Sequence, residues 1–175
     1  SKPCRTVQSQ NLETIQGCLL PPCTSRNKTL VNASPDGTLM AIVNRYSIRV
    51  DWGDCDPAGI VFYPNFYRWM DRGFWLLFES QNLTLEALNR RFGVFGGPLV
   101  DTGATFVAPA RMGDKLTVTS QVDHWSRKSF RLRHEFTCDD TKVASGFETR
   151  IWGTRKDDGA IRAGIIPDEV KVLFG

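Results

Sequence analysis

The sequence predicts an α+β domain in which one antiparallel sheet curls around one long apolar helix. Three observations lead to this fold class. A strand pattern precedes the helix pattern, the helix is apolar over a broad side, and four strand-like runs joined by short turns follow it. A single sheet wrapped around the helix buries the apolar side of every element. No internal repeat or linker interrupts residues 41–175.

The first strand is predicted at residues 44–52, where apolar and polar residues alternate with a period of two. Its apolar side carries Tyr46, Ile48, Val50 and Trp52. The helix is predicted over residues 64–81 and begins with Pro64, since proline is favoured at the first helical position. Its apolar residues are Phe66, Met70, Gly73 and Leu77, widened by Trp69, Phe74 and Phe78.

A glycine-rich connection at residues 89–98 leads into the four predicted strands. These strands cover residues 99–109, 115–125, 129–138 and 142–156. In the third of them, apolar residues and His134 alternate with charged residues and a threonine, which is the pattern of a strand with one buried face. In the second, His124 falls on the same side as the apolar positions.

Length and composition agree with one globular domain. The chain has 175 residues, of which 41% are hydrophobic and 23% charged. A net charge of +3 gives no case for a nucleic-acid or membrane-surface partner. No apolar run approaches the roughly 20 residues that span a bilayer. The sequence therefore predicts a soluble, cytoplasmic protein.

Residues 1–39 differ in composition from the rest and show neither helix nor strand periodicity. We predict a disordered or non-native leader there, followed by one domain at residues 40–175. A secreted disulfide module is the alternative, because this segment holds Cys4, Cys18 and Cys23 together with two glycosylation sequons. The remaining cysteines are isolated, as is usual for reduced cysteines of a cytoplasmic protein.

Two acids, Asp54 and Asp56, lie between the first strand and the helix in "WGDCDPAGIV" (residues 52–61). By pattern alone they belong to an ordinary turn. Cys55 is a rival nucleophile, but no histidine lies near it in the sequence.

Other catalytic patterns are missing from the sequence. His124 and His134 lack the cysteine or carboxylate spacing of a metal site, and we expect no metal. No Gly-x-Ser-x-Gly motif of a serine hydrolase occurs.

Three segments carry a family resemblance: "WGDCDPAGIVFYPNFYRWMD", "GGPLVDTGATFVAPARMGDKL" and "WSRKSFRLRHEF". They resemble the hotdog-fold acyl-CoA thioesterases of the 4-hydroxybenzoyl-CoA thioesterase family, over residues 42–173. The resemblance implies the hotdog fold and hydrolysis of an aromatic acyl-CoA to the free acid and CoA, with no cofactor. It implies a homodimer or homotetramer with shared active sites.

The resemblance gives the two acids different roles. The acid directly before Pro-Ala-Gly is catalytic in this family, which corresponds to Asp56, acting as nucleophile or as general base. The backbone N–H of Tyr63, at the helix start, would polarise the thioester carbonyl. We expect Asp54 to order the loop through Asx-type hydrogen bonds.

The substrate-binding residues implied by the resemblance are Asp71, Leu85, Gly97 and Pro98. Asp71 would face the acyl end, although a plain helix-surface acid is the alternative. Leu85 stands where the family has a tryptophan lining the aromatic pocket. A short or medium aliphatic acyl-CoA is therefore the alternative substrate.

The phosphates of CoA would bind Arg127, Lys128 and Arg162, which match basic positions of the family. Ser126 replaces a further basic residue of the aromatic-specific members. Without the resemblance, these charges would belong to a solvated face.

Two other function classes remain open. A hotdog hydratase or dehydratase would pair a histidine with an acid, and neither histidine is near Asp56 in the sequence. A non-catalytic acyl-CoA sensor is the other alternative, since a fold does not fix a function.

Overall fold

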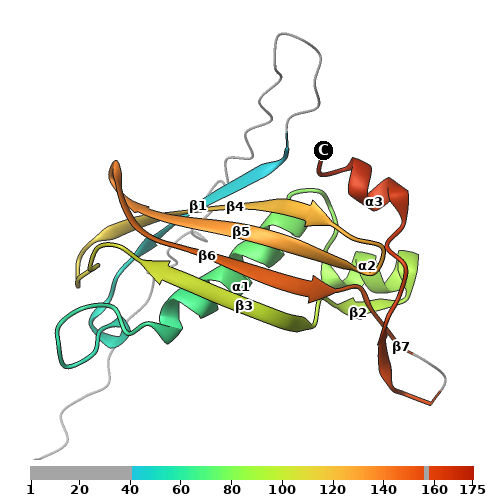
Figure 1. Ribbon diagram of the computed structural model, residues 1–175, viewed down its shortest axis with the longest axis horizontal. Helices are drawn as coiled ribbons and strands as arrows, with labels where there is room; N and C mark the ends of the chain where they lie inside the picture. The colour runs from blue at the N-terminus through green and yellow to red at the C-terminus, as the bar shows by residue number, and fades with distance from the viewer. Residues whose placement is uncertain (1–40, 156–157) are drawn as a thin grey trace, which may run out of the picture.

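The computed structural model describes residues 41–155 and 158–175. A five-stranded antiparallel sheet, in the order β1-β4-β5-β6-β3, curls around helix α1 (Pro64–Glu79) (Figure 1). Its strands are β1 (Val43–Arg49), β3 (Leu99–Phe106), β4 (Lys115–Trp125), β5 (Ser129–Cys138) and β6 (Thr141–Ile151). The α+β class and the wrapped central helix are therefore confirmed. The predicted leader at residues 1–39 lies outside the described residues.

Helix α1 begins at Pro64, as its sequence predicts, and ends two residues before the predicted end. Its side toward the sheet buries an aromatic and aliphatic stripe, which stabilises the helix mainly by removing apolar surface from water. The buried members are Phe66, Trp69, Met70, Gly73, Phe74, Leu77 and Phe78. The Tyr46 hydroxyl donates a hydrogen bond to the Trp69 carbonyl and ties β1 to the helix. Burial raises the pKa of Tyr46 well above its ordinary value, so the hydroxyl keeps its proton.

Two apolar clusters fill the space between α1 and the sheet, one around Phe74 and Phe78 and the other around Phe66 and Met70. A row of three fully buried polar residues crosses the inner face of the sheet: Asn44 on β1, Ser120 on β4 and His134 on β5. We call these three residues the polar row. Ser120 is paired in register with both of the others.

Helix α2 (Leu85–Phe92) was not predicted, and its second half overlaps the glycine-rich connection expected at residues 89–98. The Thr84 hydroxyl caps it by accepting a hydrogen bond from the Ala87 N–H, and Gly93 ends it in the left-handed conformation. Only Leu88 of this helix is buried, so its apolar stripe is too narrow to stand out in the sequence.

The last predicted strand, residues 142–156, is in fact interrupted at Trp152. The Trp152 N–H still donates to the Lys128 carbonyl at 3.0 Å, in continuation of the β5–β6 register, whereas the Trp152 carbonyl accepts from the Gly164 N–H at 2.8 Å. The chain then forms a second sheet in the order β2-β7-β8 and a short C-terminal helix. Their bounds are β2 (Val94–Gly96), β7 (Gly153–Arg155), β8 (Ile161–Ala163) and α3 (Asp168–Val172).

Two side chains lie elsewhere than the strand patterns predicted. Trp52 is 83% exposed, because β1 ends at Arg49 and the chain turns into a single 3₁₀ turn. His124 is exposed because the register between β4 and β5 shifts after Val122.

Candidate active site

The loop at residues 52–62 connects β1 to α1 and carries Asp56. One carboxylate oxygen of Asp56, Oδ1, accepts a hydrogen bond from the Ala58 N–H at 2.8 Å, which forms an Asx turn. The Asp56 N–H donates to the Ile60 carbonyl at 2.9 Å and closes the loop. Among the described residues, Oδ2 of Asp56 has no hydrogen-bond partner. The loop thus orients one oxygen and leaves the other available.

Asp54 orders the same loop in a different manner from the Asx bond that we expected. Its Oδ2 accepts from the N–H of Asp51, three residues earlier, at 2.9 Å. Its backbone carbonyl accepts from Phe62 N–H at 2.8 Å and from Asn65 Nδ2 at 2.9 Å. Asp54 therefore anchors the loop to the first turn of α1, whereas the Asx turn belongs to Asp56.

The start of α1 leaves one backbone donor without a partner among the described residues. The Asn65 and Phe66 N–H groups bond to the carbonyls of Phe62 and Tyr63 in a tight first turn. Pro64 has no N–H, and the Tyr63 N–H has no partner among the described residues. This single free donor lies at the positive end of the helix dipole.

Asp56 and Tyr63 line the same cavity, which has a volume of about 490 Å³. Its other walls are apolar and come from the loop, the first turn of α1, the end of β3 and the segment after β3. These residues are Ile60, Val61, Phe66, Phe106, Val107, Ala108, Pro109 and Ala110. Asp56 also lines a second hollow with Cys55 and Met112. The cavity can hold an apolar group, and Asp56 and Tyr63 both lie in its wall.

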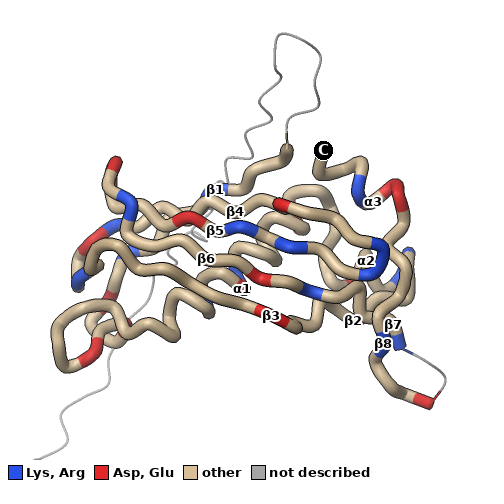
Figure 2. Tube along the Cα trace, viewed as in Figure 1, with Lys and Arg blue, Asp and Glu red and all other residues tan. Residues whose placement is uncertain are grey.

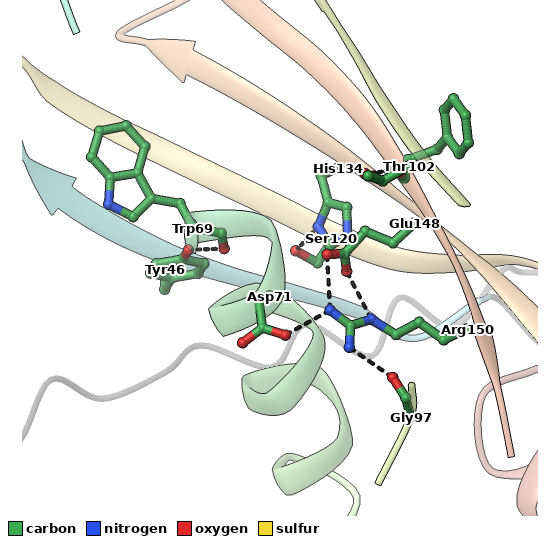
Figure 3. Close-up of polar contacts among 10 residues, drawn as sticks. Tyr46, Trp69, Asp71, Gly97, Thr102, Ser120, His134, Glu148 and Arg150 are labelled. Carbon is green, nitrogen blue, oxygen red and sulfur yellow. Dashed lines mark hydrogen bonds and ion pairs between the residues drawn. The ribbon is translucent and has the colours of Figure 1, made fainter. Parts of the chain in front are cut away.

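A second group of polar residues lies further along α1 (Figure 3). Asp71 extends from the helix to the buried Arg150 of β6, with Asp71 Oδ1 2.6 Å from Arg150 Nη2. Nη1 of Arg150 donates to the Gly97 carbonyl at 2.8 Å. Two residues that the resemblance placed at the substrate are therefore joined by an arginine that the sequence analysis did not single out.

The network continues into the core through Glu148, which binds Arg150 through both carboxylate oxygens at 3.1 and 2.8 Å. His134 Nε2 lies 3.4 Å from Glu148 Oε2, and His134 Nδ1 lies 2.9 Å from Ser120 Oγ. Burial would raise the pKa of Glu148, but the contacts with His134 and Arg150 outweigh burial and lower it below its ordinary value. Glu148 is therefore a carboxylate at neutral pH, and its charge balances that of Arg150.

Arg150 and Glu148 have only a weak signal in the sequence. Gly146, Glu148 and Arg150 recur with a period of two, but two charges on one strand face normally indicate solvent. Here that face is the inner one.

The proposed CoA-binding residues lie together at the opposite end of the molecule from Asp56. The Arg127 carbonyl accepts from the Ile166 N–H at 3.0 Å, and Arg162 lies on β8, paired in register with Thr154. Arg127 and Lys128 lie in the connection between β4 and β5. Figure 2 shows basic residues at this end, beside β7, β8 and α3.

The distance between Asp56 and these basic residues follows from the length of β4. The 52–62 loop adjoins its first residue, since Lys115 pairs with Arg49, and Arg127 follows its last. Eleven extended residues span about 35 Å. One chain thus does not bring Asp56 together with Arg127, Lys128 and Arg162.

A family model described as the thioesterase-like superfamily matches residues 50–171, which is more than half of the chain. The chain belongs to this superfamily.

Individual relatives support a narrower likeness within the superfamily. Over 89 residues the chain is 39% identical to the 4-hydroxybenzoyl-CoA thioesterase of Pseudomonas sp. (strain CBS-3), covering 49% of this chain and 62% of that enzyme. Over 94 residues it is 31% identical to a 1,4-dihydroxy-2-naphthoyl-CoA hydrolase of Synechocystis sp., covering 54% and 63%. In both alignments the chain spans less than two thirds of the curated relative.

Two solved structures confirm the fold over nearly the whole length of the compared chains. The 4-hydroxybenzoyl-CoA thioesterase from Pseudomonas sp. strain CBS-3 gives a TM-score of 0.69 at 32% identity, covering 75% of this chain and 98% of that one. A gentisyl-coenzyme A thioesterase gives 0.63 at 34% identity, covering 74% and 98%. The hotdog fold and the resemblance to the 4-hydroxybenzoyl-CoA thioesterases are thereby confirmed. These relatives are named thioesterases or hydrolases, in agreement with the predicted enzyme class.

The remaining predicted residues of this thioesterase-like chain lie apart from the Asp56 cavity. Leu85 is the first residue of α2 and is 47% exposed. Pro98 is half-buried against Gly153, where a Cβ would come 2.7 Å from the proline ring. His134 is buried in the core, and no group of three metal-ligating side chains occurs in the described part of the chain. None of the described helices is long and apolar enough to cross a membrane.

Proposed function

We propose that this protein is an acyl-CoA thioesterase that hydrolyses the thioester of a hydroxylated aromatic acyl-CoA. The observation that carries the proposal is the cavity shared by Asp56 and Tyr63. A thioester carbonyl placed there would have its oxygen at the Tyr63 N–H and its carbon beside the free oxygen of Asp56. Both groups are positioned before substrate arrives, which is what electrostatic stabilisation of a developing oxyanion requires.

Two mechanisms use these groups. In the first, Asp56 attacks the carbonyl carbon, the CoA thiolate leaves, and water hydrolyses the resulting mixed anhydride. In the second, Asp56 takes a proton from a water molecule, the resulting hydroxide attacks the carbonyl carbon, and the C–S bond then breaks to release the free acid and the CoA thiolate, which takes up the proton. In both, the negative charge on the carbonyl oxygen is stabilised by the Tyr63 N–H and by the dipole of α1.

The class of acyl group is supported by the relatives and by Asp71. The relatives are named for 4-hydroxybenzoyl, gentisyl and dihydroxynaphthoyl thioesters, all of them hydroxylated aromatic acids. Asp71 would accept a hydrogen bond from the ring hydroxyl at the acyl end of the site. Leu85, in place of the family's tryptophan, favours an aliphatic acyl-CoA as the second candidate.

A site shared between two subunits is part of the proposal. Asp56 and the basic residues Arg127, Lys128 and Arg162 are about the length of β4 apart within one chain. Strand β3 is an edge of the sheet and exposes Leu99, Val100 and Phe106. An edge of this kind is a natural surface for pairing with a second copy. We therefore propose a homodimer or homotetramer in which one chain supplies Asp56 and another binds the CoA phosphates.

A thiol-release assay over a panel of acyl-CoAs tests this function. We expect turnover of 4-hydroxybenzoyl-CoA and benzoyl-CoA, with hexanoyl-CoA slower. Faster turnover of hexanoyl-CoA would instead select the aliphatic alternative. Tight binding of acyl-CoA without release of thiol would contradict hydrolysis and favour an acyl-CoA sensor.

A further inference from the structure

Arg150 is the most extensively bound side chain among the described polar residues of the core. It is only 5% exposed, and its guanidinium reaches three different parts of the chain. It binds Glu148 on its own strand, Asp71 on α1 and the Gly97 carbonyl between β2 and β3. Its guanidinium carbon also lies 4.3 Å from the centre of the Phe74 ring, so the ring packs against one face of the planar guanidinium.

Asp71 is the exposed end of this network. Its side chain is 54% exposed, in contrast to the buried partners behind it. Oδ1 is occupied by Arg150, and Oδ2 has no partner among the described residues. The network thus presents a single oriented acceptor oxygen at the surface of α1.

Stability alone does not account for these charges. Apolar residues of similar volume in place of a buried ion pair often leave a protein equally stable or more stable, because desolvating the charges is costly. Glu148 already satisfies the charge of Arg150 within the core, with two hydrogen bonds. The additional bonds to Asp71 and Gly97 serve to fix those two groups relative to each other.

We propose that Arg150 is a positioning residue for the acyl end of the site, holding the Asp71 carboxylate and the Gly97 carbonyl in one rigid arrangement. This inference rests on the proposed thioesterase function. Glu148, backed by His134, orients the guanidinium from inside the core. The arrangement sets Asp71 to accept a hydrogen bond from a hydroxyl on the acyl group.

The geometry requires an arginine. Asp71 and Gly97 are bound by Nη2 and Nη1 of the guanidinium, while Nε and Nη2 bind Glu148. A lysine ammonium keeps the charge but cannot donate hydrogen bonds to three groups that lie in one plane. Arg150→Lys therefore keeps the charge balance with Glu148 and removes the planar set of guanidinium donors.

The test compares kcat/KM for 4-hydroxybenzoyl-CoA and benzoyl-CoA, which differ only in the ring hydroxyl. We expect the wild type to favour the hydroxylated thioester, and Arg150→Met and Arg150→Lys each to lower that ratio roughly tenfold. Asp71→Asn should lower it as well, and adding Arg150→Met to Asp71→Asn should change it little further, because both act through one contact. The matched control is Arg91→Met, which breaks an exposed pair with Glu169 and should leave the ratio unchanged.

The outcomes separate this inference from the proposed function. A wild type that hydrolyses neither thioester refutes the proposed function itself. A wild type that hydrolyses both, with an Arg150 variant that slows them equally, shows that Arg150 acts only on folding. If Arg150→Met does not fold, the ratio in Arg150→Lys decides, because the charge on Glu148 is still balanced there.

Discussion

Gly73 determines how closely α1 approaches the polar row. A Cβ at this position would lie 2.4 Å from Ser120 Oγ and 3.3 Å from His134 Nδ1. The 2.4 Å separation is well inside van der Waals contact, so an added methyl group forces either the helix outward or Ser120 out of its hydrogen bond with His134. Glycine costs about 1 kcal/mol in a helix interior relative to alanine. We infer that close packing outweighs this cost.

Gly73→Ala should therefore lower the free energy of unfolding by roughly 1–3 kcal/mol, in spite of the better helix propensity of alanine. Urea denaturation measures the change. In a Ser120→Ala background the same substitution should cost much less, because the clashing oxygen is gone. A stabilising effect of Gly73→Ala in the wild-type background would mean that the helix does not approach the sheet this closely.

At the scale of single residues, the sequence shows that Asp56 and Tyr63 are neighbours but does not reveal the network around Arg150. Asp56 and Tyr63 belong to a contiguous motif at a strand-to-helix junction, and a contiguous motif can be recognised in the sequence without knowledge of the fold. Arg150, Asp71 and Gly97 come together only in the folded chain. A buried charge cannot be recognised before its counter-charges are known, because an unpaired one would not be buried at all.

At the scale of elements, predictability follows the amount of apolar surface that an element buries. Helix α1 has a strong start signal in Pro64 and a wide apolar stripe, and it was predicted to within two residues. Helix α2 has a cap at both ends but only one buried residue, so its pattern resembles a polar connection. The break at Trp152 comes where its carbonyl accepts a hydrogen bond from the Gly164 N–H, a contact that no local pattern contains.

At the scale of the whole molecule, the separation of Asp56 from the basic residues makes a prediction about assembly. In a shared site, one chain supplies Asp56 and its partner supplies Arg127 and Lys128. Arg127→Ala/Lys128→Ala should raise KM for acyl-CoA by roughly 10- to 100-fold, the worth of one or two charge-assisted hydrogen bonds, with little change in kcat.

Mixed oligomers test the sharing directly. A chain with Asp56→Asn is combined with a chain carrying Arg127→Ala/Lys128→Ala, and activity is measured at acyl-CoA concentrations far below the raised KM. Shared sites leave some sites with an intact Asp56 and intact basic residues, so the mixture should exceed the sum of the separate variants. Activity equal to that sum would place each site within one chain.

The central claim is that the Asp56 carboxylate does chemistry on the thioester. Asp56→Asn keeps the shape of the side chain and its Asx turn but removes the negative charge. Asp54→Asn is the matched control, since Asp54 lies on the same loop and bonds only to backbone and to Asn65 in the described structure.

The measurement is kcat for hydrolysis of 4-hydroxybenzoyl-CoA by these two variants, with their melting temperatures recorded in parallel. Asp56→Asn should lower kcat by roughly 10²–10⁴, the usual contribution of a positioned acid–base group, with its melting temperature nearly unchanged. Asp54→Asn should lower kcat much less than Asp56→Asn does, and should lower the melting temperature more. An Asp56→Asn protein that turns over at nearly the wild-type rate would contradict the mechanism.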